Sequence, residues 1–163
     1  MIDQQTIINA FIDNLSRLNE HLDKLCNVLL HEETALAEQN VEKIDSLAAE
    51  KNQLTTQVEQ AEQLRQSHCK QLQINPDKKA IQQWLKTKPA VLQQQVSSLW
   101  KHITYLGQKC STQNQINGIL VAHLERHTQD ALSILRGAVT GQDSYSETGS
   151  HENKQDQHII AKA

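Results

Sequence analysis

Histidine is the residue type in this sequence most suited to chemistry, because the chain holds eight of them and imidazole is a common metal ligand. Di-iron and di-manganese sites in helical bundles place a Glu three residues before a His, and none of the eight histidines has one there. His123 and His127 lie four residues apart and could jointly hold a divalent metal. However, the segment between them puts Glu125 at a different offset from the His-Glu-x-x-His zinc motif. We therefore expect no metal site and no cofactor. A metal carrier or helical-bundle enzyme that uses this pair is one alternative.

Other groups that catalyse reactions are also unfavourably spaced. The three cysteines, Cys26, Cys69 and Cys110, are far apart and odd in number, which predicts reduced thiols rather than a disulfide framework. The sequence contains neither a Gly-rich phosphate-binding loop nor a Gly-x-Ser-x-Gly nucleophile elbow. We expect no catalytic residues and predict that the protein is not an enzyme.

The composition indicates which elements carry these residues. Of 163 residues, 3% are aromatic, two are Pro, and all five Gly follow residue 106, which is typical of long helices and coiled coils. The net charge of −3, with both signs interspersed, argues against nucleic-acid binding. No apolar run approaches the roughly 18 residues that span a bilayer, and the first residues lack the pattern of a secretory signal. We therefore expect a cytoplasmic protein that does not insert into membranes.

The segment from residue 89 to residue 136 has the longest helical pattern. Its apolar residues recur at spacings of three and four, which keeps them on one helical face. The residues of this stripe are Leu92, Val96, Leu99, Ile103, Leu106, Cys110, Leu120, Leu124, Ala131 and Ile134. Gln113 and Asn117 lie on the same stripe but are polar. Pro89 suits the first helical position, and Gly137 suits a C-terminal cap.

This helix is expected to be about 70 Å long at about 1.5 Å per residue, longer than the two helices before it. If its first part packs on those helices, apolar residues between Ile116 and Leu135 would be left uncovered. An exposed apolar patch of this kind usually marks an interaction site.

Shorter helical patterns precede it at about 3–38 and 41–72, and the short connection at Asn40 predicts that they form an antiparallel hairpin. A short helix at about 76–87, capped by Asn75, carries Trp84, which we expect to pack against the end of the bundle.

The predicted fold is therefore all-α: an elongated antiparallel helical hairpin plus a long further helix, forming a three-helix bundle or coiled coil over residues 1–139. Residues 140–157 have almost no aliphatic side chains, and we predict that residues 140–163 form a disordered tail.

Two parts of the sequence resemble one known family. Residues 29–54 read LLHEETALAEQNVEKIDSLAAEKNQL, which is similar to the hairpin corner of the FlgN family of flagellar export chaperones. The C-terminal half resembles the same family in Asn114-x-x-Asn117-Gly118, in Leu132-x-x-Leu135, and in a Tyr-x-x-x-Gly element at Tyr145.

The resemblance implies a cytoplasmic type III secretion chaperone that binds the C-terminal segments of the hook–filament junction proteins FlgK and FlgL. It also implies docking on the export gate protein FlhA through a tyrosine beyond the client-binding helix, which here would be Tyr145. The client-binding residues expected on this basis are Asn114, Asn117, Gly118, Leu120, Leu124, Leu132 and Leu135.

The residues themselves fit this function, because an apolar helical stripe can accept the amphipathic helix of a partner. Asn114 and Asn117 could fix the register of that partner, and Gly118 would favour bending of the helix. This interpretation predicts a monomer or weak homo-oligomer. The other alternative is a structural or adaptor coiled-coil protein that self-associates through the 89–136 helix.

Overall fold

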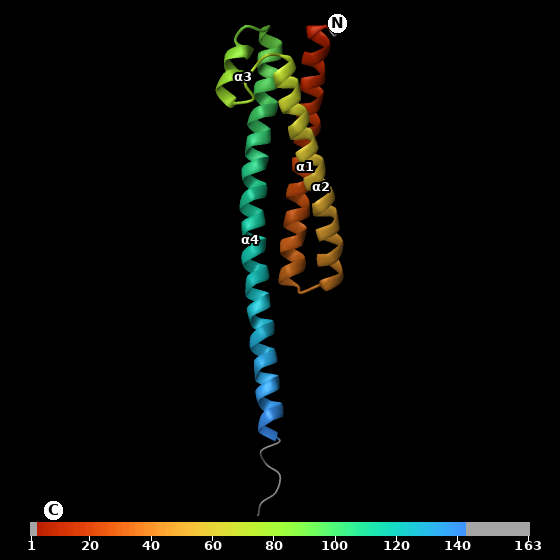
Figure 1. Ribbon diagram of the computed structural model, residues 1–163, viewed down its shortest axis with the longest axis vertical. Coiled ribbons are helices and arrows are strands. Elements are labelled where there is room, and N and C mark those ends of the chain that lie inside the picture. Colours follow the sequence, from red (N-terminus) through yellow and green to blue (C-terminus); the bar gives the residue numbers. More distant parts are fainter. Residues whose placement is uncertain (1–2, 143–163) are drawn as a thin grey trace, which may run out of the picture. The chain divides into compact units, whose positions relative to one another are not determined.

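The computed structural model describes residues 3–142, and the side chains of residues 3–137. In that range it contains four helices and no strand (Figure 1): α1 (Gln4–Ala37), α2 (Val41–Gln71), α3 (Lys78–Leu85) and α4 (Ala90–Gln142). The prediction of an all-α fold is confirmed. Residues 143–163, which hold most of the predicted tail and Tyr145, lie outside the described residues.

The chain divides into two compact units, residues 1–124 and 125–163. The first unit contains α1, α2, α3 and the larger part of α4, and the described part of the second unit is the remainder of α4. No described helix has an apolar stretch that is long enough to cross a membrane.

In the first unit, α1 and α2 form the antiparallel hairpin seen in Figure 1. The chain leaves α1 through Gln39, whose φ of 53° lies in the left-handed region. The side chain of Asn40 then accepts a hydrogen bond of 3.1 Å from the backbone N–H of Lys43, which caps α2. The short connection that the sequence predicts at Asn40 is thus present between α1 and α2.

One end of the first unit is closed by α3. A core cluster there draws on all four helices and contains Ile8, Phe11, Leu15, Cys69, Leu72, Ile81, Leu85 and Val96. Trp84 of α3 meets Phe11 of α1 edge-to-face, with ring centroids 6.2 Å apart, and this confirms that Trp84 packs against the bundle end. The cap of α3 is Asp77, which accepts a 2.7 Å hydrogen bond from the N–H of Ala80; the prediction of Asn75 as the cap was wrong.

A second core cluster lies further along the hairpin and joins α1, α2 and α4. Its members are Leu18, Leu22, Cys26, Leu29, Ala61, Leu106 and Cys110. Within this cluster, a disulfide bond links Cys26 to Cys110. Their Cα atoms are 5.0 Å apart, a separation that a disulfide can span. The prediction of three reduced cysteines was therefore wrong for this pair, whereas Cys69 is free and buried.

The end of α4 also differs from the prediction. The helix continues past Gly137 to Gln142, so Gly137 is an interior helical residue rather than a C-terminal cap. A helical Gly is less favourable than Ala by only about 1 kcal/mol, so a single Gly does not by itself have to end a helix.

Candidate functional site

A group of buried and half-buried polar side chains connects α4 to the hairpin. We call it the polar clamp, and its members are Gln113, Asn117, Glu32, Glu33 and Lys51. Asn117 is only 2% exposed. Its Nδ2 donates to the carbonyl oxygen of Leu29 at 2.8 Å and to Oε2 of Glu32 at 2.7 Å. Gln113, one helical turn earlier, donates to Oε2 of Glu33 at 2.7 Å and to Oδ1 of Asn117 at 3.1 Å.

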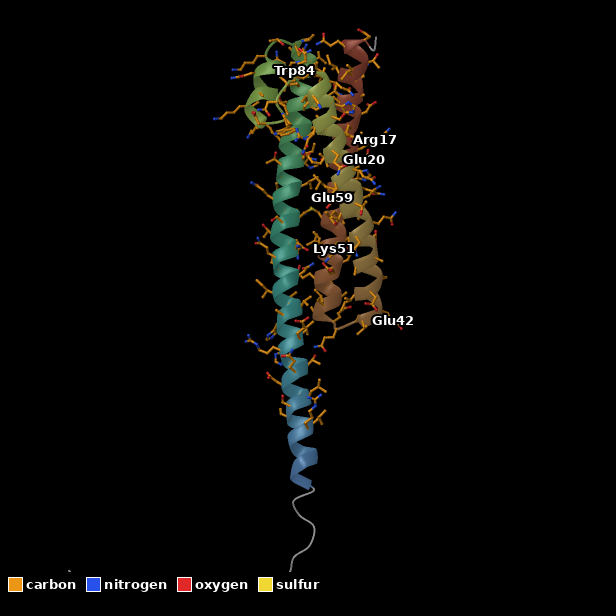
Figure 2. The ribbon with its side chains drawn as sticks, in the orientation of Figure 1. Arg17, Glu20, Glu42, Lys51, Glu59 and Trp84 are labelled. Atoms are coloured by element: carbon orange, nitrogen blue, oxygen red, sulfur yellow. A yellow bond between two sulfur atoms is a disulfide. The ribbon has the colours of Figure 1, made fainter. Side chains whose placement is uncertain are left out.

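The carboxylate of Glu32 receives a second partner from α2. Glu32 is 6% exposed, and a buried carboxylate is strongly unfavourable unless it is paired and hydrogen-bonded. Nζ of Lys51 lies 2.6 Å from Oε1 of Glu32, and Figure 2 shows Lys51 on α2 within the hairpin. Asn117 and Lys51 therefore hold one oxygen each, so this single carboxylate ties α1 to both α2 and α4.

A second polar group fixes the connection between α2 and α3. Arg65 donates to both carboxylate oxygens of Glu62, at 2.7 and 2.6 Å, and to the carbonyl oxygen of Pro76 at 3.0 Å. Its guanidinium also lies over the Trp100 ring, 5.2 Å from the centroid. The hydrogen bond to Glu62 raises the pKa of Arg65. Burial alone would raise the pKa of Glu62, but the hydrogen bonds from Arg65 and Gln66 outweigh it and the pKa is lowered.

Beyond the clamp, the part of α4 in the first unit has apolar side chains in contact with solvent. Ile119 is 71% exposed and Val121 is also exposed. Ile116, which immediately precedes Asn117, is exposed as well. Leu120 and Leu124 are half-buried, whereas Asn114 and Gly118 are exposed. Of the five expected client-binding residues in this unit, only Asn117 is buried, and its Nδ2 is already hydrogen-bonded to α1.

The second unit is described as far as residue 142, with side chains as far as residue 137, and it also has exposed apolar side chains within that range. Leu132 is 46% exposed and Leu135 is 61% exposed, and Ile134 between them is also exposed. These are the two remaining residues expected to bind clients. Tyr145, the expected docking residue, lies outside the described residues.

The two histidines considered for metal chemistry lie on one helix. Among the described residues there is no group of three or more His, Cys, Asp or Glu side chains that could hold a metal ion. His123 and His127 lie on α4, as the sequence predicts.

Sequence reasoning identified Gln113 and Asn117 as polar interruptions of the stripe but missed their partners Glu32 and Glu33. The signal was present, because two polar residues one turn apart on an otherwise apolar stripe require polar partners on the helix that they face. What the sequence lacked was the register that places residue 117 of one helix beside residue 32 of another.

The comparison with protein families agrees with the motifs. The family described as FlgN protein matches residues 1–153, nearly the whole chain. No curated protein and no solved structure matches the sequence. Because the match extends over both the hairpin and α4, the chain belongs to the FlgN family of flagellar export chaperones.

Proposed function

We propose that this protein is a cytoplasmic chaperone that binds the C-terminal segments of FlgK and FlgL, prevents their premature assembly, and delivers them to the export gate protein FlhA. The single observation that carries the proposal is the exposed apolar surface of α4 beyond the polar clamp. Ile119 in the first unit, and Leu132 and Leu135 in the second unit, present aliphatic side chains to solvent. Full burial of each such side chain is favourable by roughly 1.5–3 kcal/mol.

The position of the clamp suggests that two parts of α4 have different roles, the first in packing on the hairpin and the second in binding the client. Residues up to Asn117 are held on the hairpin by buried hydrogen bonds, and the residues after it are exposed or half-buried. A partner helix with an apolar face could pack on those later residues without displacing the hairpin. In this proposal, Asn117 acts by fixing the register of α4, while Leu120, Leu124, Leu132 and Leu135 contact the client.

Gly118 and Asn114 have roles that follow from their position beside the clamp. Both are exposed, and a Cβ added at Gly118 would meet no atom within 4 Å. Close packing in the free protein therefore does not require Gly at this position. We propose that Gly118 allows α4 to bend when a client binds, and that Asn114 offers a polar contact to the client backbone.

Calorimetry tests the proposal directly. The full-length protein is titrated with peptides that correspond to the C-terminal segments of FlgK and FlgL from the same organism. We expect submicromolar binding that is lost when Leu124 and Leu132 are both changed to Asp. Leu64→Asp is the matched control, because Leu64 is an exposed leucine of α2. Absence of binding to either segment, or an equal loss in the control, would contradict the proposal.

Docking on FlhA is tested separately with Tyr145→Ala. This variant should bind the client segments normally and bind the cytoplasmic part of FlhA more weakly. Tyr105→Ala, which removes an exposed tyrosine of α4, is the matched control. Loss of both interactions, or of neither, would rule out the proposed role of Tyr145.

The same exposed apolar residues could instead pair with a second copy of the chain, as in the coiled-coil alternative. Light scattering distinguishes the two. The chaperone proposal expects a monomer or weak oligomer that forms a discrete complex with the client segment, and the alternative expects a stable homo-oligomer whether or not the segment is present.

A further inference from the structure

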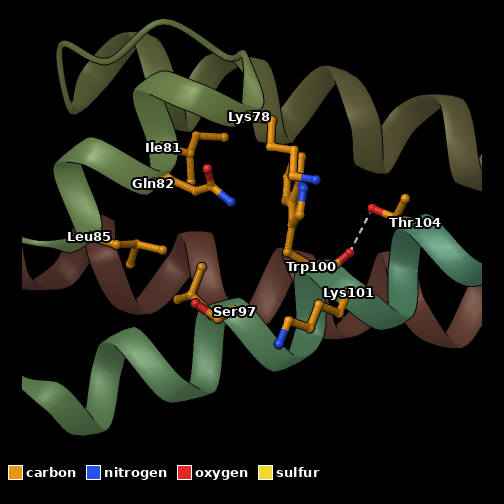
Figure 3. Close-up of a pocket in the computed structure, with 9 residues that line it drawn as sticks. Lys78, Ile81, Gln82, Leu85, Ser97, Trp100, Lys101 and Thr104 are labelled. Atoms are coloured by element: carbon orange, nitrogen blue, oxygen red, sulfur yellow. Dashed lines mark hydrogen bonds between the residues drawn. The ribbon is translucent and has the colours of Figure 1, made fainter.

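A cavity of about 320 Å³ lies between α3 and α4 in the first unit (Figure 3). Its apolar surface comes from the buried residues Ile81, Leu85 and Val96 and from the indole of Trp100. Its polar surface comes from Gln82, Ser97 and Thr104 and from two lysines. The volume is at the lower end of the range for ligand sites, about 300–1,000 Å³, and is suited to one or two large side chains.

The charge around this cavity is of one sign. Lys78 of α3 and Lys101 of α4 line it, and Lys79 and Lys86 line an adjoining hollow of about 400 Å³. Neither lining includes an Asp or a Glu. None of these four lysines forms an ion pair with a described carboxylate.

This positive charge contrasts with the rest of the chain. Residues 77–101 contain five lysines and one aspartate, a formal charge of +4, whereas the whole chain carries −3. The fifth lysine, Lys88, lies over the Trp84 ring at 4.9 Å. The other four are therefore the ones available to an anionic partner.

The wall of the cavity is held in place by contacts that do not use the lysines. The guanidinium of Arg65 lies over Trp100 at 5.2 Å, and Oγ1 of Thr104 donates to the carbonyl oxygen of Trp100 at 2.9 Å. Asp77 caps α3, and the hydrogen bond from Arg65 to Pro76 fixes the segment that leads into it. The cavity is thus formed before any partner arrives, which reduces the entropy lost on binding.

We propose that this cavity is a docking site for an acidic peptide segment of a partner protein. A large apolar side chain of that segment enters between Ile81, Leu85 and Trp100, and its flanking carboxylates pair with Lys78 and Lys101. The apolar side chain supplies most of the affinity, as buried anchors do at interfaces. The lysines contribute mainly orientation and association rate.

A peptide is favoured over an anionic membrane surface by the burial of α3. A basic helix that binds membranes inserts its apolar face into the headgroup region. Here that face is used inside the protein, because Ile81 and Leu85 belong to the core and Trp84 packs on Phe11. The surface of the protein at this point therefore has a cavity that can accept a side chain, and it lacks an exposed apolar helical face that could insert into lipid.

The site is separate from the proposed client surface, which begins at residue 114 of α4, and the inference does not depend on client binding. It is tested with a displayed library of random 12-residue peptides selected on the full-length protein. Selected peptides should share Asp or Glu residues around a Leu, Ile, Phe or Trp. Their affinity should fall at least about tenfold in the Lys78→Glu, Lys101→Glu double variant and in Ser97→Trp, which fills the cavity.

The matched control is Lys24→Glu, an exposed charge reversal on α1, which should leave peptide affinity unchanged. Binding should also weaken as salt is raised from 0.05 to 0.5 M, because exposed charges are screened. Circular dichroism melting verifies that each variant is folded.

Three results would overturn the proposal. The first is a selected set without an acidic and apolar pattern, or binding that ignores both cavity variants. The second is lysine-dependent flotation with phosphatidylglycerol vesicles in the absence of peptide binding, which would make the surface a membrane contact. The third is a homodimer in sedimentation velocity that is lost in the same variants, which would make a second copy of this chain the occupant.

Discussion

Asn117 of α4 and Glu32 of α1 are joined by a 2.7 Å hydrogen bond between two buried side chains. The two residues are 85 positions apart in the sequence. This bond, together with the one from Asn117 to Leu29, sets the register of α4 against the hairpin. Asn117 is also the last buried residue of α4 among those whose side chains are described, so the apolar residues that follow it up to Leu135 are exposed or half-buried.

The clamp predicts a large effect of Asn117→Ala on stability. The substitution leaves the carbonyl oxygen of Leu29 and one oxygen of Glu32 without their donor, and unsatisfied buried groups are unfavourable by about 1–3 kcal/mol each. Urea unfolding should show a loss of at least about 2 kcal/mol. Asn114→Ala, a change at an exposed asparagine of the same helix, should alter stability by less than about 0.5 kcal/mol. Similar effects of the two substitutions would contradict the role given to the clamp.

The pairing of Glu62 with Arg65 predicts a dependence of stability on pH. The pKa of Glu62 is lowered from its ordinary value of 4.5. As the pH falls below about 4.5, the unfolded chain therefore binds a proton that the folded chain does not yet bind. The stabilisation from Glu62 is complete above this pH and is lost as the pH falls through the lowered pKa.

Denaturant unfolding of wild type and Glu62→Gln between pH 3 and pH 7 measures this contribution. The stability difference between the two proteins should be constant near neutral pH and should shrink in acid. Glu59→Gln, an exposed change on the same helix, is the control. A difference that grows in acid would mean that the pKa is raised rather than lowered.

The bond between Cys26 and Cys110 predicts the number of reactive thiols. Protein purified without reductant and unfolded in guanidinium should show one free thiol, that of Cys69, out of three cysteines. Because the bond closes a loop across 84 residues, reduction should lower the unfolding free energy by about 4.5 kcal/mol in the chain-entropy description. Three reactive thiols before reduction would contradict the bond.

Substitution of Gly118 should have opposite effects on the stability of the free protein and on client binding. Since an added Cβ meets no atom within 4 Å, Gly118→Ala should stabilise the free protein by about 1 kcal/mol. If α4 bends there when the client segment binds, the same substitution should weaken client binding. Gly107→Ala, at another α4 glycine with open space around it, should stabilise without changing client affinity. Equal client affinity in both variants would remove Gly118 from the binding mechanism.

The helices and the turn of the hairpin could be predicted from the sequence, because local residue patterns determine them. Stripes at three- and four-residue spacing located the helices, and Asn40 located the turn of the hairpin, because both signals depend on neighbouring residues. The Cys26–Cys110 bond and the Glu32–Asn117 pair depend instead on the register of helices more than 80 residues apart, which no local pattern specifies. Gly137 was misleading because a Gly inside a helix is unfavourable by only about 1 kcal/mol relative to Ala, so its presence alone does not specify a helix end.

Hydrogen exchange is the most direct test of the claim that clients bind on α4 beyond the clamp. The full-length protein is compared with and without a saturating FlgK or FlgL C-terminal segment, and protection is read for each backbone segment. The account predicts new protection within residues 116–135 and little change in α3. Protection confined to the hairpin or to the cavity between α3 and α4 would place the client elsewhere and contradict the account.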